Sequence, residues 1–139
     1  MSCILCNPAE ADAHFQRVEV WQNRLWRVTT SLVAPVAGFS YLETKRHLDY
    51  ITDLDGEEAE TLGPTLAWVT RMLRETTGAQ MIYVNVFGER VAHLHFNLGP
   101  HKEGDALRGG SAMLAENAPP LPKHDLESIA ARLRENLNR

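Results

Sequence analysis

Three polar side chains that can handle phosphate or metal stand at alternate positions of the sequence, at His93, His95 and Asn97. Apolar residues fill the positions between them, so residues 91–98 are predicted to form a strand. Because side chains alternate between the two faces of a strand, we expect the three polar groups on one face, with neighbours roughly 7 Å apart. One phosphate or one metal ion can bridge groups at that spacing. The alternative is a solvated strand face that carries imidazoles without a function.

The two cysteines of the chain, Cys3 and Cys6, are three residues apart. This spacing is usual for half of a zinc site, with a redox pair or a pair of inert thiols as the alternatives. Two thiols so close in sequence do not constrain a fold as a disulfide framework does.

Residues 88–100, GERVAHLHFNLGP, are similar to the signature of the histidine triad (HIT) family, Gly-Gln-x-Val-x-His-x-His-x-His followed by two apolar positions. Residues 42–47, LETKRH, resemble the family's Pro-Lys-x-His segment, and the cysteine pair matches one found in many bacterial members. The resemblance covers about residues 3–100. Two positions depart from the pattern, because Asn97 replaces the third histidine and Glu89 replaces the glutamine.

The resemblance implies that His95 is the nucleophile, which attacks the α-phosphorus of a nucleotide and forms a nucleotidyl-histidine. His93 and Asn97 complete the implied catalytic set, although an amide can donate a hydrogen bond and cannot pass on a proton. The implied activity is that of a hydrolase or nucleotidyl transferase acting on a purine nucleotide derivative, such as a dinucleoside polyphosphate or a similar anhydride. The alternatives are a nucleotide-binding or regulatory protein with little turnover and a zinc-stabilised interaction domain.

Further residues follow from the same resemblance. It implies nucleotide contacts from Asn85, Gly88 and Arg90, of which Arg90 is equally well explained as a surface residue. It also implies a structural Zn²⁺ and no organic cofactor, the zinc being held by Cys3, Cys6, His47 and His93. The alternative to zinc has His93 as a satisfied core histidine and His47 as a strand-end residue.

The elements that must position these residues are predicted from periodicity and turn residues. Besides residues 91–98, four strands are expected, at residues 17–21, 24–30, 39–45 and 81–87. Asn23 is expected to turn the first hairpin with a positive φ. A long helix is expected from Asp55, in a capping box with Glu58, to Thr77, with Pro64 kinking or splitting it. Asp125 is expected to cap a last helix.

The order of these elements favours an α+β fold, and the resemblance implies its HIT-like form: a five-stranded antiparallel sheet, one long helix and a C-terminal helix. The 139 residues are expected to make one domain, 1–139, with 101–139 forming a loop and that last helix. A net charge of −4 without a basic run weighs against a nucleic-acid polymer as partner. No apolar stretch suits a membrane span or a secretory signal, so a cytoplasmic protein is expected. The resemblance also implies a homodimer.

Overall fold

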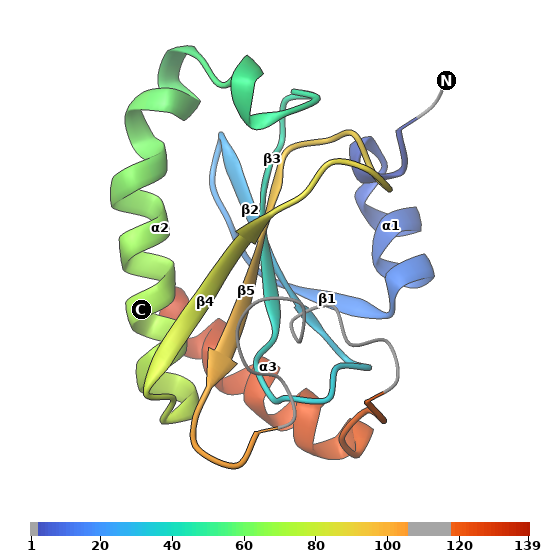
Figure 1. Cartoon of the computed structure of the whole chain (residues 1–139), viewed down its shortest axis with the longest axis vertical. Coiled ribbons are helices and arrows are strands. Elements are labelled where there is room, and N and C mark those ends of the chain that lie inside the picture. Colours follow the sequence, from blue (N-terminus) through green and yellow to red (C-terminus); the bar gives the residue numbers. More distant parts are fainter. Residues whose placement is uncertain (1–2, 106–117) are drawn as a thin grey trace.

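The structure is a computed structural model that describes residues 3–105 and 118–139. Five strands form one antiparallel sheet in the order β1-β2-β3-β5-β4 (Figure 1). The strands are β1 (Arg17–Gln22), β2 (Trp26–Ser31), β3 (Ser40–Thr44), β4 (Met81–Val86) and β5 (His95–His101). The helices are η1 (Ile4–Cys6), α1 (Pro8–Phe15), η2 (Ile51–Asp53), α2 (Gly56–Thr77) and α3 (Lys123–Leu137). The α+β class and the five-stranded antiparallel sheet expected from the sequence are confirmed.

The hydrophobic core lies between one face of the sheet and the helices α2 and α3. Alternation along the strands sends Trp26, Val28 and Leu42 into this layer, where each is fully buried. Val69 and Leu73 of α2 meet them, together with the apolar stripe of α3 formed by Ala130, Leu133 and Leu137. Figure 1 shows α1 on the opposite side of the sheet from α2. The strand residues that alternate with the core face α1, and most of them are polar.

The strand of the histidines differs from its expected position. β5 begins at His95 rather than 91 and continues through Pro100 to His101, so His101 is a strand residue and not a loop residue. His93 precedes the strand because its imidazole is bound elsewhere, with Nε2 donating to the Thr44 carbonyl at 2.6 Å. Pro100 is tolerated because β5 pairs with β3 only as far as Leu98 and beyond it pairs only with β4.

Several local expectations also need correction. Helix α1 was not predicted; it begins with Pro8 at its first turn and buries only Ala11. Asn23 turns the hairpin differently from the prediction: its side-chain oxygen accepts the backbone N–H groups of Leu25 and Trp26, and Gln16 is the one non-glycine residue with positive φ among those described.

The helix ends were predicted correctly only in part. α2 runs unbroken through Pro64 and ends at Thr77, followed by the C-cap residue Gly78 with a φ of +74°. Asp55 is its N-cap residue, but no capping box forms with Glu58, because both carboxylates bind the Arg46 guanidinium instead. α3 begins at Lys123, so Asp125 lies inside its first turn and is not the cap.

Part of the loop expected after residue 101 falls at 106–117, outside the described residues. Within the described part of the chain, none of the helices is long and apolar enough to cross a membrane.

Candidate functional site

A cavity of about 460 Å³ opens on the polar face of the sheet. Its floor comes from the strands, through Arg17, Tyr41, His95 and Asn97. One wall is formed by residues 87–91, which connect β4 to β5, and the other by Leu5 and Phe15. The cavity therefore combines apolar and aromatic walls with a polar floor, a composition typical of small-molecule sites.

His95 is held in one orientation at this floor. Its Nδ1 lies 2.6 Å from the main-chain carbonyl of His93. A carbonyl only accepts, so Nδ1 carries the proton and Nε2 keeps its lone pair, for which the described part of the chain provides no donor. This tautomer is the one that an attacking imidazole needs.

Asn97 shares the face of His95, two residues further along β5, and lines the same cavity. In the ladder it lies between Tyr41 of β3 and Asn85 of β4. The Asn85 amide nitrogen is buried and has no hydrogen-bond partner among the described residues. Asn85 lies next to the cavity floor rather than in the cavity lining, whereas Gly88 and Arg90 both line it.

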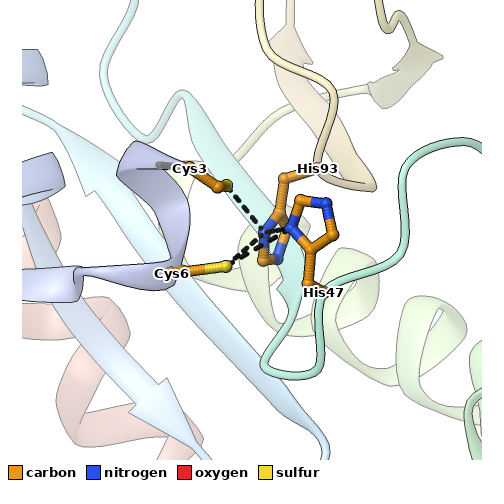
Figure 2. Close-up of side chains that lie close together, drawn as sticks. All are labelled: Cys3, Cys6, His47 and His93. Carbon is orange, nitrogen blue, oxygen red and sulfur yellow. Dashed lines mark hydrogen bonds between the residues drawn. The ribbon is translucent and has the colours of Figure 1, made fainter. Parts of the chain in front are cut away.

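His93 does not share the strand face of His95 and Asn97, contrary to the alternation expected from the sequence. It is fully buried, and its ring points toward the cysteines (Figure 2). Its Nδ1 lies 3.2 Å from the Cys3 sulfur and 3.6 Å from the Cys6 sulfur. His47 completes the group, with its Nδ1 3.3 Å from both the Cys6 sulfur and the His93 Nδ1.

These four donor atoms fit a zinc ion. All lie within 4.8 Å of one another. Tetrahedral zinc with Zn–S near 2.3 Å and Zn–N near 2.0–2.1 Å separates its ligand atoms by roughly 3.3–3.8 Å, close to the 3.2–3.6 Å contacts of this cluster. Thiolates and imidazoles are also the donors that zinc prefers.

The Nε2 atoms of both imidazoles are bound by other groups, which leaves the two Nδ1 atoms facing the cluster. His47 Nε2 lies 2.6 Å from the Asp49 carboxylate, and His93 Nε2 donates to Thr44 O. Such contacts fix the tautomer and orientation of metal-binding histidines. Burial lowers the pKa of His93, which favours the neutral form that coordinates metal. Burial and the neighbouring Cys3 thiol raise the pKa of Cys6.

A buried cluster of charged residues beneath α1 was missed by the sequence analysis. The Arg17 and Arg27 guanidiniums, with side chains 3% and 6% exposed, share the Glu43 carboxylate, which is 2% exposed. Asp12 of α1 binds both guanidiniums, and Glu19 binds that of Arg27. Charges at alternate positions of strands β1 to β3 were a signal of this cluster, since those side chains share one face.

Tyr50 supports the cavity wall formed by residues 87–91. A Cβ atom at Gly88 would lie 2.8–2.9 Å from the Tyr50 ring, so the ring packs directly on the backbone at this glycine. The Tyr50 N–H donates to Asp53 at 3.0 Å, which fixes the turn from which the ring extends.

No protein-family model matches the sequence, and no curated protein matches it either. Solved structures do match. A histidine triad protein from Sinorhizobium meliloti superimposes with a TM-score of 0.74 at 21% identity, over 91% of this chain and 93% of that one. This chain has the histidine triad fold.

Two further solved structures match the fold of this chain. A zinc-bound histidine triad family protein from Mycobacterium smegmatis aligns over 99% of this chain and 94% of its own, with a TM-score of 0.72 and 18% identity. A uridylyltransferase aligns over 99% of this chain, at a TM-score of 0.69 and 21% identity, but this chain spans only 45% of it. The histidine triad resemblance of residues 88–100 thus agrees with the three-dimensional fold.

Proposed function

We propose that this protein is a nucleotide hydrolase or nucleotidyl transferase that acts at the α-phosphate of a purine nucleotide derivative, such as a dinucleoside polyphosphate. The observation that carries the proposal is the His95 imidazole, which lines the cavity with its Nδ1 bound by the His93 carbonyl at 2.6 Å and its Nε2 lone pair free. The likeness in fold to a uridylyltransferase supports a role in nucleotide chemistry.

The cavity suits the parts of a nucleotide. The Phe15, Tyr41 and Phe87 rings at its walls and floor offer apolar surface for a base. Arg90 and the backbone at Gly88 would meet the phosphates, because a guanidinium and a backbone N–H both donate to phosphate oxygens. The buried amide of Asn85 supplies an unused donor beside the same floor.

In the proposed reaction, His95 Nε2 attacks the α-phosphorus. A nitrogen–phosphorus bond forms as the bond to the leaving oxygen breaks, and water or another acceptor then cleaves the nucleotidyl-histidine. The His93 carbonyl stabilises the ring as its positive charge develops. Asn97 donates a hydrogen bond to the phosphoryl group but has no proton to give the leaving group. Leaving groups that depart as stable anions are therefore favoured.

We further propose that Cys3, Cys6, His47 and His93 hold one Zn²⁺. Its role would be structural, because the protein fills all four ligand positions and leaves none for water. The zinc-bound histidine triad protein from Mycobacterium smegmatis supports this proposal. A cytoplasmic location would keep these thiols reduced and able to bind metal.

We also propose a homodimer formed through β4. This strand is at the edge of the sheet and leaves Met81, Val84 and Val86 exposed. Beside it, an apolar groove of about 410 Å³ runs between α2 and β4, lined by Leu66 and Val84 among others. An uncovered strand edge next to an apolar groove is a surface that proteins normally cover. A second copy would cover both features at once.

The proposed activity is tested by a turnover screen with dinucleoside polyphosphates, nucleoside phosphoramidates and nucleotide sugars. Reactions that are quenched without acid are then analysed by mass spectrometry for a covalent adduct. We expect a nucleotidyl adduct on His95, and loss of turnover in His95→Ala with the fold retained. His124→Ala is the control, because His124 lies exposed on α3. Near-normal turnover in His95→Ala would contradict the mechanism. Tight nucleotide binding without an adduct would indicate a regulatory protein. Absence of nucleotide binding would indicate a zinc-stabilised interaction domain.

A further inference from the structure

One wall of the cavity is built from a segment that is otherwise weakly attached to the protein. We call residues 3–15, which comprise η1 and α1, the N-terminal wall. Leu5 and Phe15 from this segment line the cavity that His95 also lines. Figure 1 shows α1 beside the sheet, on the side away from α2. Whatever fixes the N-terminal wall therefore also fixes one side of the cavity.

Hydrophobic packing contributes little to this attachment. Leu5 and Ala11 are the buried apolar side chains of the N-terminal wall, and neither belongs to the two hydrophobic clusters found among the described residues. Burial of so little apolar surface cannot by itself hold an eight-residue helix in place, since isolated helices of that length are not stable. The attachment must rely on polar contacts.

Two sets of polar contacts hold the two ends of the N-terminal wall. The Cys3 and Cys6 sulfurs join its first residues to His47 and His93. In its second half, Asp12 accepts from Arg17 Nε at 2.9 Å and from Arg27 Nη1 at 3.0 Å. Both guanidiniums are already fixed to the sheet by Glu43, so Asp12 binds a rigid partner.

One of these guanidiniums also belongs to the cavity. Arg17 lines the cavity floor, and its Cζ lies 5.6 Å from the centre of the Phe15 ring and 5.7 Å from that of Tyr41. Such stacking of a cation on aromatic faces is favourable. The ion pair from Asp12 to Arg17 and the position of Phe15 over Arg17 are therefore parts of one arrangement.

We propose that Asp12 is a positioning residue for the nucleotide site: its ion pairs with Arg17 and Arg27 hold the N-terminal wall against the sheet, so that Leu5 and Phe15 form a side of the cavity. This inference rests on the proposed function. The reacting side chain, His95, lies on β5 and not on the N-terminal wall. Asp12 therefore acts on substrate binding and not on the chemical step.

Asp12→Asn tests the inference without leaving a buried charge uncompensated. In the wild type, the two guanidiniums face the three carboxylates of Asp12, Glu19 and Glu43. The substitution changes the net charge of this cluster from −1 to zero, and both guanidiniums keep a carboxylate partner, Glu43 for Arg17 and Glu19 with Glu43 for Arg27. Glu10→Gln is the matched control, because Glu10 is an exposed carboxylate of the same helix without an ion pair among the described residues.

The experiment combines hydrogen exchange by mass spectrometry with kinetics on diadenosine tetraphosphate. In Asp12→Asn we expect faster exchange confined to residues 3–15, KM raised roughly tenfold and kcat within about twofold of the wild type, as loss of charge-assisted hydrogen bonds would give. Glu10→Gln should match the wild type. Phe15→Ala, which leaves the ion pairs intact, should raise KM without a change in exchange at residues 8–14.

Unchanged exchange in Asp12→Asn would overturn the inference, as would a fall in kcat at constant KM. The exchange measurement needs no nucleotide. Failure of the proposed function would instead appear as a wild-type protein without turnover, whatever the exchange result.

Discussion

At the scale of single residues, His93 joins the two candidate sites through different atoms. Its imidazole belongs to the cluster with Cys3 and Cys6, while its main-chain carbonyl accepts the proton of His95 Nδ1. A substitution at position 93 removes the imidazole and keeps the carbonyl. The orientation of His95 is thus supplied by the backbone, and the side chain of His93 is free to bind a metal.

Asn97 is expected to set the choice of leaving group. A phosphoramidate must have its amine protonated as it leaves, and Asn97 cannot supply that proton. We expect the wild type to prefer phosphoanhydrides, and Asn97→His to raise the phosphoramidate rate selectively, by up to about 10²-fold, the lower end of what general-acid catalysis contributes. Paired kcat/KM measurements on diadenosine tetraphosphate and an adenosine phosphoramidate check this.

The matched control for that substitution is Asn85→His, which places an imidazole on the neighbouring strand, opposite Asn97 in the ladder. A similar gain in both variants would mean that any nearby imidazole suffices. Equal wild-type efficiency on the two substrate classes would refute the role given to Asn97.

At the scale of elements, the start of α2 is fixed by an ion pair with a defined pH dependence. The hydrogen bond from Arg46 lowers the pKa of Glu58 below its ordinary value of 4.5. A lowered carboxyl pKa adds stability at pH values above the ordinary pKa, and that stability is lost as the pH falls through the lowered pKa. We expect Glu58→Gln to unfold at lower urea concentration than the wild type at pH 7, with the difference shrinking as the pH falls below 4.5.

Glu60→Gln is the control for this prediction, because Glu60 is exposed on the same helix and is not among the partners of Arg46. Urea midpoints measured from pH 3 to pH 7 for the three proteins give the comparison. A gap between Glu58→Gln and the wild type that stays constant across this range would contradict the assigned role of the ion pair.

Local signals in the sequence were sufficient for most elements. Alternation and turn residues located the sheet strands to within a few residues, and helical periodicity located α2 almost from end to end. The start of β5 was misplaced because His93 is held by residues distant in sequence, such as Thr44, which no local pattern reveals. α1 was missed because it carries almost no amphipathic pattern and is attached by polar contacts.

The candidate site, like the fold, was predicted only in part. The cysteines and histidines were identified because their types and spacing are distinctive. The charged cluster of Arg17, Arg27 and Glu43 was not, because each residue alone looks like a solvated strand position. Only the pairing of β1, β2 and β3 brings these charges together.

At the scale of the whole molecule, the proposed dimer is tested by a charge at the β4 edge. We expect Val84→Glu to convert a dimer into a monomer, because the carboxylate would be buried against α2 and β4 of both copies. Val33→Glu is the matched control, since Val33 and Val84 are both 39% exposed and Val33 lies in the connection between β2 and β3, not on β4. Light scattering after gel filtration gives the mass. A monomeric wild type would refute the dimer.

The proposed zinc joins segments from three parts of the chain, and its loss should be felt by the whole fold. We expect close to one zinc per chain in wild-type protein purified without chelator, and none in the Cys3→Ser/Cys6→Ser variant. The melting temperature of the variant should be several degrees below that of the wild type. Elemental analysis and calorimetry measure both. Chelator should lower the wild-type melting temperature to that of the variant, and added zinc should restore only the wild type. Metal-free wild type with the variant's stability would refute the site.

The order of the cluster residues along the chain has a consequence for biosynthesis. Cys3 and Cys6 leave the ribosome first, and His93 follows Cys3 by 90 residues. At about 5–20 residues per second, translation of that interval takes roughly 5–20 s. Through that interval the nascent polypeptide carries the two thiols with an incomplete ligand set, because His47 follows Cys6 by 41 residues and His93 comes last. They are then open to oxidants and to competing metals, so the reductant and zinc available during synthesis would determine how much of the protein acquires the proposed zinc site.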